Sequence, residues 1–315
     1  MTDGTHGRRA LVTGGAGFIG HHLVAALLRR GLEVTVLDDL SMGRRENVPP
    51  QARFVQGDVR DPEQVTVALN GVDCVFHEAA IVSIRASVEG FVRDAEVNLV
   101  GTLNLLQCMA DSGVKKAVFA SSMAVYADSQ APVALAEDSP LRPISPYGVS
   151  KLASEQYWLL MGRHFGLDTT VLRYFNTYGP GQTPTPYVGV ITIFINRLLR
   201  GEAPVIYGDG EQRRDFVHVD DVVSANLAVL DADVAGRTFN VGTGHGTSVT
   251  DIARELTARL APDLKPRHAA PVEGEMRNAI ADASALRKAT GWTPIRPRPD
   301  FDNVVEYWRA RAAAK

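Results

Sequence analysis

The sequence predicts an α/β protein in which a doubly wound parallel sheet is followed by a smaller α/β unit. The first observation is that short β-branched runs alternate with longer amphipathic segments. This alternation is typical of a parallel sheet that helices cover on both faces, with strands that are apolar throughout. The second observation is a glycine-rich turn directly after the first strand, where such sheets bind dinucleotides. Together they indicate the Rossmann architecture.

Six strands are expected in the first part of the chain. They are ALV at 10, EVTVL at 33, RFVQ at 53, CVFH at 74, KAVFAS at 116 and TTVLR at 169. After about residue 179 Gly and Pro accumulate and the elements become shorter, so we expect a dinucleotide-binding domain over 1–179 and a second domain over 180–315. The apolar runs DFVHVDD and FNVG are compatible with a return of the segment from about 215 to 245 to the main sheet.

The composition narrows the range of partners. With 33 basic and 36 acidic residues, the 315-residue chain has a formal net charge of −3 and no basic excess for nucleic acid or anionic lipid. The first residues lack the apolar core of a signal peptide, and no stretch approaches the ~20 apolar residues of a membrane span, so a cytoplasmic location is expected. Cys74 and Cys108 lie in apolar runs, so neither a disulfide nor a metal site is predicted.

The glycine-rich turn TGGAGFIG, residues 13 to 20, lies between the first strand and the helical run HHLVAALLRR. Gly15, Gly17 and Gly20 match the G-x-G-x-x-G spacing, and Gly14, Gly17 and Gly20 match a variant spaced by threes. Either spacing lets the backbone turn tightly and approach a pyrophosphate at the helix N-terminus. The turn therefore predicts a dinucleotide site.

The second strand ends in Asp38, 18 residues beyond Gly20. An acid at this place accepts the hydroxyls of an adenine ribose and repels a 2′-phosphate, which favours NAD over NADP. Two alternatives stay open. Asp38 and Asp39 are also suited to a polar turn, and Arg44 and Arg45 could soften the repulsion.

Polar residues follow three further strands, in GDV at 57, HEAA at 77 and SSMAVY at 121, at the carboxyl edge of the sheet, where an open sheet places its ligand. Asp58 in GDV could hold an adenine amino group, and it is as well suited to a turn. Ser122 in SSMAVY combines with Tyr147 and Lys151 of YGVSK, which are four apart and share one helix face. These three supply a donor, a base and a cation around one substrate hydroxyl.

From Arg9 to Trp292 the chain resembles the extended short-chain dehydrogenase/reductases, and within them the nucleotide-sugar 4-epimerases of the UDP-galactose 4-epimerase type. The resemblance rests on an ordered series of motifs. They are TGGAGFIG, GDV, HEAA, SSMAVY, YGVSK, RYFNTYGPGQ at 173 to 182 and IYGDGEQRRDFVHVDDV at 206 to 222.

The resemblance implies a UDP-sugar substrate, an NAD cofactor and a substrate-binding role for 180–315. It implies that Ser122, Tyr147 and Lys151 are catalytic, that Asn176 reaches the substrate phosphates and that Arg214 binds the diphosphate. The cofactor-binding residues that it implies are Gly14, Gly17, Phe18, Ile19, Gly20, Asp38, Asp39, Asp58, Val59, Ala79, Ala80, Asn98, Tyr147 and Lys151. The substrate-binding residues that it implies are Ser122, Tyr147, Asn176, Val190, Tyr207, Arg214 and Ala279.

The two residues after the catalytic Ser largely decide the reaction among relatives, and here they are Met123 and Ala124. Neither moves a proton, so hydride transfer out and back remains, with epimerisation at C4 through a 4-keto sugar. We expect Lys151 and the positive nicotinamide ring to lower the pKa of Tyr147, so that its phenolate takes the 4-hydroxyl proton. The alternatives are a 4-ketoreductase or dehydrogenase, an epimerase of a dTDP-, GDP- or UDP-uronic acid sugar, and a non-catalytic dinucleotide sensor.

A homodimer is also expected from the resemblance. Helices near 94–111 and 146–165 resemble those that pair as a four-helix bundle in the family, and Trp158, Leu159 and Leu106 could provide apolar area. The alternative is that these side chains pack on the sheet.

The run VEGEMRNAIAD, residues 272 to 282, departs from the family pattern. Val272 stands where an Arg is expected, and Arg277 or Arg213 could compensate. The resemblance places Ala279 at the position where, in relatives, the size of the side chain limits the substituent at C2 of the sugar. A tyrosine there excludes an N-acetyl group and an alanine leaves room for it, so we expect UDP-GlcNAc and UDP-GalNAc to be accepted besides UDP-Glc and UDP-Gal. The alternative is a shifted loop and a different nucleotide sugar.

Overall fold

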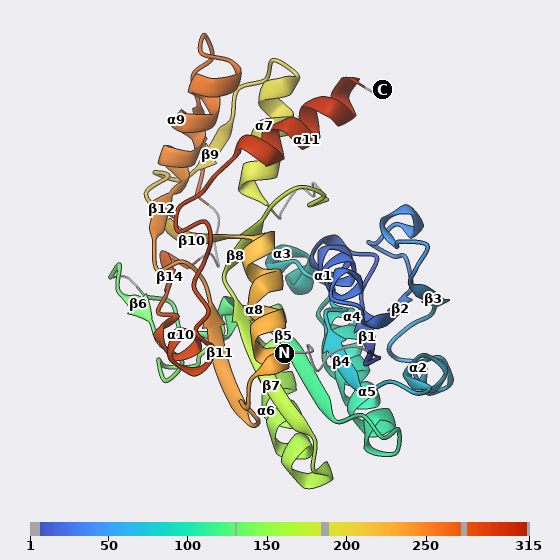
Figure 1. The fold of residues 1–315 in the computed structure, drawn as a ribbon. Helices are drawn as coiled ribbons and strands as arrows, with labels where there is room; N and C mark the ends of the chain where they lie inside the picture. Colours follow the sequence, from blue (N-terminus) through green and yellow to red (C-terminus); the bar gives the residue numbers. More distant parts are fainter. Residues whose placement is uncertain (1–6, 130, 184–188, 272–275, 314–315) are drawn as a thin grey trace.

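The largest element of the protein, described here from a computed structural model, is a seven-stranded, fully parallel sheet (Figure 1). The structure describes residues 7–129, 131–183, 189–271 and 276–313. The spatial order is β11-β7-β5-β4-β1-β2-β3. The strands are β1 (Arg9–Thr13), β2 (Glu33–Asp38), β3 (Arg53–Gln56), β4 (Cys74–His77), β5 (Lys116–Ser122), β7 (Asp168–Tyr174) and β11 (Arg237–Val241).

The strand order reverses between β1 and β4, because β2 and β3 continue to one side and β5 and β7 to the other. At such a reversal the connections leave in opposite directions and open a crevice at the carboxyl ends of the strands. The prediction of a doubly wound parallel sheet is confirmed.

Helices cover both faces of this sheet. One face carries α2 (Pro62–Leu69), α5 (Gly101–Ala110) and α6 (Pro146–Phe165), and the other carries α1 (Phe18–Arg29), α8 (Val219–Asp231) and α10 (Ser284–Thr290). The short helices α3 (Ile84–Glu89) and α4 (Phe91–Ala95), a π-helical turn (Glu96–Val100) and single 3₁₀ turns (Arg45–Asn47, Met123–Val125) complete this part. The central strands β1, β4 and β5 are buried and largely apolar, as the sequence pattern predicted, whereas the edge strand β3 is only partly buried and β7 carries the buried polar residues Thr169, Thr170 and Arg173.

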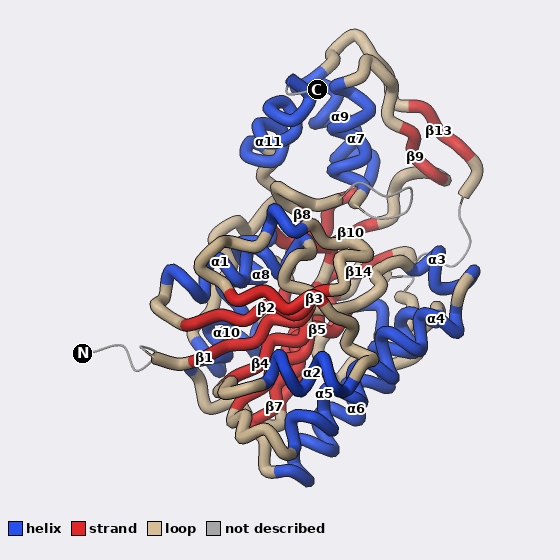
Figure 2. Tube along the Cα trace, turned by 90° about the vertical axis from the view of Figure 1, so that its right-hand side faces the viewer, coloured by secondary structure: helices blue, strands red, loops and turns tan. Residues whose placement is uncertain are grey.

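A smaller group of elements lies beyond the carboxyl edge of the sheet, with α7, α9 and α11 above the sheet in Figure 2. Its strands are β6 (Ala134–Leu135), β8 (Asn176–Tyr178), β9 (Val205–Tyr207), β10 (Arg213–His218), β12 (Gly246–Ser248), β13 (Arg267–Ala269) and β14 (Asn278–Ala281). Its helices are α7 (Val190–Leu199), α9 (Val249–Leu260) and α11 (Asp302–Ala313), which enclose a separate apolar core.

The chain crosses between the two groups more than once. Strand β10 belongs to the smaller sheet, whereas α8 packs on the large sheet and β11 forms its edge. Where the domain boundary lies within this arrangement stays a prediction.

A buried network ties α6 to three strands of the large sheet. The Arg173 guanidinium on β7 donates to both carboxylate oxygens of Glu155 on α6, at 2.9 and 2.8 Å. Ser121 of β5 donates to the same carboxylate. Arg173 also donates to the Tyr126 hydroxyl, which donates to Asn240 of β11. The side chains of Glu155 and Arg173 are only 4% and 5% exposed, so α6 has one position against the sheet.

We predict that Glu155→Gln lowers the free energy of unfolding by roughly 3 kcal/mol, because it leaves the Arg173 charge buried without its counter-ion. Equilibrium urea unfolding measures this loss. The matched control is Glu255→Gln, which removes one partner of the exposed Arg259–Glu255 pair and is expected to cost less than ~1 kcal/mol. Equal losses in the two variants would contradict a special role for the buried pair.

Candidate active site

A cavity of about 780 Å³ lies between the carboxyl edge of the large sheet and the smaller group of elements. It extends from the glycine-rich turn after β1 to β8, β9 and β10. The predicted cofactor-binding and catalytic residues that line it are Gly14, Gly17, Phe18, Ile19, Gly20, Asp38, Asp39, Asp58, Val59, Ala79, Ala80, Ser122, Tyr147 and Lys151. Of the other predicted substrate residues, Asn176, Val190, Tyr207 and Arg214 line it too.

The glycine-rich turn forms a cradle that only glycine permits. Gly14 has a φ of +69°, and a Cβ there would lie 2.7 Å from the backbone nitrogen of Ala79. A Cβ on Gly20 would overlap the carbonyl oxygen of Gly14. A Cβ on Gly15 would meet the Val36 side chain, and Gly15 does not line the cavity. The variant spaced by threes therefore shapes this site, and it leaves the α1 N-terminus open to the pyrophosphate of NAD.

Asp38 is held rigidly at the end of β2. Its carboxylate accepts from the backbone N–H groups of Ala16 and Leu40, at 2.9 and 2.8 Å, and burial raises its pKa. Neither Arg44 nor Arg45 lines the cavity, and the Arg45 guanidinium lies over a phenylalanine ring instead. An acid without a neighbouring guanidinium in the cavity favours NAD over NADP.

Asp58 and Asn98 have different surroundings. Asp58 lines the cavity and pairs with Arg60 at 2.6 Å, and this hydrogen bond lowers the pKa of Asp58. The Asn98 amide accepts from the Ile81 N–H and donates to the Ile81 carbonyl and to Asp94. Asn98 does not line the cavity, so the structure places this predicted cofactor residue behind the wall, where it supports the segment around Ile81.

The predicted catalytic side chains converge at the ends of two elements. Ser122 ends β5, and Tyr147 and Lys151 lie one helical turn apart near the start of α6. Ser145 caps this helix, because its hydroxyl oxygen accepts a hydrogen bond from the Gly148 N–H. The Ser122 hydroxyl accepts from the Ala124 N–H at 3.2 Å and lowers the pKa of the neighbouring Tyr147 phenol. The Lys151 ammonium donates to the Ala120 carbonyl at 2.8 Å and lies 6.0 Å from the centre of the Tyr147 ring.

Burial dominates the titration of both helix residues. It raises the pKa of Tyr147 well above its usual value, against the lowering effect of the Ser122 hydroxyl. Burial lowers the pKa of Lys151 to about 8, although Glu78, Asp94 and Glu155 oppose this shift. The expectation that Lys151 lowers the pKa of Tyr147 is therefore not met by the chain's own groups, because desolvation outweighs them.

The substrate end of the cavity contains an unsatisfied polar group. The side-chain oxygen of Asn176, at the start of β8, is buried and has no hydrogen-bond partner among the described residues. The Arg214 guanidinium donates to the backbone oxygens of Arg213 and Arg277 and also lines the cavity. At the rim, the Arg85 guanidinium lies 5.4 Å from the centre of the half-exposed Tyr207 ring. The guanidinium groups suit a phosphorylated ligand, whereas the Asn176 oxygen, an acceptor, suits a donor such as a hydroxyl group on the same ligand.

Ala279 is not brought to the cavity. It is fully buried in β14, where it pairs with Arg214 of β10, and among the described residues of this segment Met276 is the one that lines the cavity. A role for Ala279 beside the sugar is therefore not supported. Val272, the expected Arg position, lies outside the described residues.

The two arginines named as substitutes for that Arg have other partners. Arg277 forms a bidentate pair with Asp209 at 2.8 and 2.9 Å, and Arg213 donates to the Gly246 carbonyl. Neither lines the cavity. Guanidinium groups that do line it, besides that of Arg214, belong to Arg85, Arg93 and Arg197. The sequence offered no periodicity or motif that would single these out.

Glu78 and Tyr174 line the cavity without having been assigned a role. Both lie in motifs that support the family resemblance, HEAA and RYFN. The motifs were therefore the available signal, but the sequence does not reveal that the two side chains touch.

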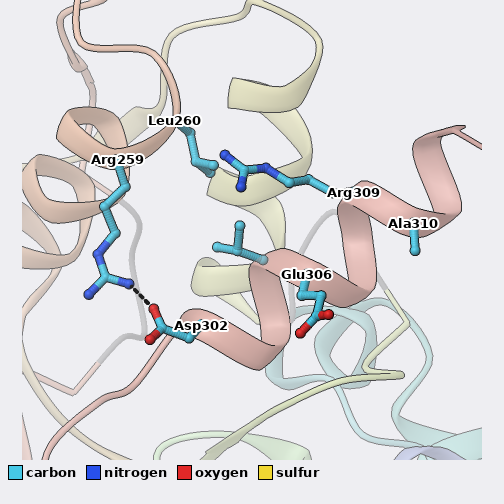
Figure 3. A pocket seen from close by; sticks show the side chains of 7 residues that line it. Arg259, Leu260, Asp302, Glu306, Arg309 and Ala310 are labelled. Carbon is cyan, nitrogen blue, oxygen red and sulfur yellow. Dashed lines mark hydrogen bonds and ion pairs between the residues drawn. The ribbon is translucent and has the colours of Figure 1, made fainter.

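A second depression lies between α9 and α11 (Figure 3). Arg259 and Asp302 point toward each other across it and pair at 2.6 Å. It is remote from the strand ends and its charged groups are exposed, so the larger cavity is the candidate active site. In the described ranges no group of three His, Cys, Asp or Glu could hold a metal, and no helix is long and apolar enough to cross a membrane.

Comparisons with known proteins agree with this site. Residues 10–242 match the model of the NAD dependent epimerase/dehydratase family. A UDP-glucose 4-epimerase of Mycolicibacterium smegmatis is 36% identical over 311 residues, which cover 96% of this chain and 99% of that protein.

Solved structures extend the similarity to three dimensions. The UDP-glucose 4-epimerase of Thermotoga maritima with UDP-glucose superimposes with a TM-score of 0.91 at 39% identity, over 96% of this chain and 99% of that one. The UDP-glucose 4-epimerase of Thermus thermophilus in complex with NAD gives a TM-score of 0.88 at 39% identity with the same coverage. With the glycine cradle, the buried acid after β2 and the family match over most of its length, the chain belongs to the NAD-dependent epimerase/dehydratase family.

Proposed function

We propose that the protein interconverts UDP-hexoses at C4, with UDP-Glc and UDP-Gal as substrates, through a transient 4-keto sugar. The observation that carries this proposal is the immediate surroundings of Ser122. Met123 and Ala124 follow it in a buried turn, and neither side chain transfers protons. A site that holds Ser122, Tyr147 and Lys151 without a further acid or base there is suited to hydride transfer alone.

The residues divide the work along the cavity. Gly14, Gly17, Gly20 and Asp38 would hold NAD, which when bound supplies reversible hydride acceptance. Asn176 and Arg214 would hold the UDP phosphates at the other end.

Proton movement falls to the hydroxyl pair. Tyr147 takes the proton of the sugar 4-hydroxyl, and Ser122, which lies beside it and lowers its pKa, steadies or relays that proton. Because burial raises the pKa of Tyr147, the phenol keeps its own proton until positive charge enters the site. Proton transfer is thereby restricted to a loaded site.

We predict that the protein converts UDP-Gal to UDP-Glc with no net change in absorbance at 340 nm. The cofactor returns its hydride in each turnover, so an epimerase neither consumes nor releases NAD(H). Chromatography of the products from a panel of UDP-, dTDP- and GDP-sugars, with N-acetyl sugars and UDP-uronic acids included, identifies the substrate. An absorbance change equivalent to the product formed would favour a 4-ketoreductase or dehydrogenase instead.

Tyr147→Phe is expected to lower kcat by about 10³-fold or more while NAD binding stays within about twofold, because only the hydroxyl is lost from a buried ring. Kinetics and calorimetric titration with NAD measure the two quantities. Tyr307→Phe on α11, remote from the cavity, is the control and should leave both unchanged. Normal turnover in Tyr147→Phe would refute the mechanism. If the wild-type protein bound NAD but converted none of the sugars, a non-catalytic sensor would be favoured instead.

We also propose a homodimer, but through different residues from those named in the sequence. Trp158 and Leu106 are fully buried against the sheet, which makes them core residues. The outer face of α4 and α6 carries exposed apolar side chains instead: Phe91, Val92, Val149, Tyr157 and Leu160. Because the three on α6 recur at helical spacing, they form one stripe next to α4.

A cytoplasmic location stays a prediction.

Leu160→Glu is expected to shift the protein from dimer to monomer, because it places a charge within the apolar stripe. Light scattering coupled to size exclusion at micromolar concentration gives the mass. Ile295→Glu is the matched control, since Ile295 is the more exposed residue, at 71%, and lies outside the stripe. A monomeric wild-type mass would reject the dimer.

A further inference from the structure

Glu78 is a carboxylate in the cavity wall for which the proposed mechanism has no use. It follows β4 directly, and its Oε1 accepts a hydrogen bond from the Tyr174 hydroxyl at 2.8 Å. That hydroxyl in turn accepts from the side-chain amide of Asn226 at 2.7 Å. The chain Asn226–Tyr174–Glu78 thus crosses from α8 through β7 to β4 and fixes the carboxylate in place.

The position of Glu78 lies between the two functional ends of the cavity. Its backbone N–H donates to the carbonyl of Thr13, just before the glycine cradle, and its carbonyl carbon lies within 2.9 Å of where a Cβ on Gly14 would be. On the other side, β5 pairs with β4 and carries Ser122. A dinucleotide whose phosphates rest on the cradle must pass Glu78 for its redox end to meet a sugar beside Ser122.

Several charged and titratable groups face Glu78. Lys151 and Tyr147 of α6 and Tyr174 of β7 are close enough to interact with Glu78, and Asp94 of α4 acts on Lys151 as well. Asp94 is held by hydrogen bonds from Ser150 and Asn98.

No described cation lies within ion-pair distance of Glu78, in contrast to Glu155, which pairs with Arg173. Burial raises the pKa of Glu78 to about 7. Because no cation neutralises the Glu78 carboxylate, its negative charge above this pKa is available to a ligand. Of the three carboxylates that raise the pKa of Lys151, Glu78 has the largest effect.

We propose that Glu78 is a counter-ion for the oxidised nicotinamide, which makes the site bind NAD⁺ in preference to NADH. Hydride transfer brings two electrons and one proton to the cationic ring and leaves it neutral, so a nearby carboxylate stabilises only the oxidised form. The Lys151 ammonium acts in the opposite direction. In an epimerase a net preference for NAD⁺ favours return of the hydride to the 4-keto sugar before the sugar leaves. If the sugar left earlier, the cofactor would remain reduced as NADH and the site would be inactive.

The inference rests on the NAD dependence of the family and deepens the proposed epimerase function, but its test needs no sugar. Calorimetric titration of the purified protein gives separate Kd values for NAD⁺ and NADH. At pH 8, Glu78→Gln is expected to lower the ratio Kd(NADH)/Kd(NAD⁺) by about tenfold, because one carboxylate charge at close range is lost while the side-chain shape is kept. The control Glu89→Gln, an exposed carboxylate of α3 outside the cavity, should leave the ratio unchanged.

The pH dependence provides a second measurement on the wild-type protein. A carboxyl group is charged above its pKa, so the preference for NAD⁺ should rise as pH increases through about 7 and be lost below it. Glu78→Gln should lack this step. Loss of charge from Lys151 near pH 8 acts in the same direction, and in Glu78→Gln that step moves to a lower pH, because the Glu78 carboxylate raises the pKa of Lys151. The two steps are therefore separated by following both proteins over the whole pH range.

Tyr174→Phe gives an independent check, because the Tyr174 hydroxyl lowers the pKa of Glu78. This variant should show the NAD⁺ preference only at a higher pH than the wild type. It also provides the test should Glu78→Gln fail to fold. An unchanged ratio in Glu78→Gln, an equal loss of affinity for both ligands, or an unshifted pH profile in Tyr174→Phe would each overturn the proposal. None of these outcomes bears on whether UDP-Gal is epimerised.

Discussion

The buried pair between Glu155 and Arg173 is the interaction on which the geometry of the site depends. Tyr147, Lys151 and Glu155 follow one another at intervals of four, so they lie along the same face of α6. The carboxylate at the far end of this row is fastened to β7 through the guanidinium and to β5 through a serine hydroxyl. With that end fixed, the phenol and the ammonium at the near end have a single position beside Ser122.

Low solvent exposure makes each charge in this site depend on its neighbours. The Lys151 ammonium has lost most of its hydration and keeps its charge because three carboxylates lie near it. Two of these, Asp94 and Glu155, are saturated by hydrogen bonds or by a cation. The charge of the third, Glu78, is the one that can respond to a change in the ligand, since its fixed partner is a neutral hydroxyl. The electrostatic state of the cavity is thus set by groups on α4, on α6 and at the end of β4.

The sequence predicted the large sheet well because its central strands are buried on both faces and so appear as short apolar runs. The class of fold and the cofactor followed from that pattern and from the glycine-rich turn. Positions whose role depends on a local twist could not be predicted. Asn98 lies in a π-helical turn, Glu96–Val100, which rotates the following residues relative to a regular helix. Ala279 lies in a short strand whose four residues are all buried and of which none lines the cavity, an arrangement set by the packing of β14 against β10. The pKa of Glu78 depends on tertiary burial, which no motif encodes.

The two ends of the cavity differ in how they are built, and the difference suits the proposed reaction. The end proposed for the cofactor is formed by backbone in close contact, where Gly14 meets Ala79, and by a carboxylate already held by two N–H groups. Such a wall is rigid, and a ligand that fits it is retained. The end proposed for the sugar nucleotide is bounded at its rim by long side chains, with Tyr207 exposed over 45% of its surface beneath the Arg85 guanidinium. Side chains of this kind rearrange far faster than packed backbone. A product can then leave past the rim while the cofactor stays, which is the condition for a dinucleotide that is never consumed.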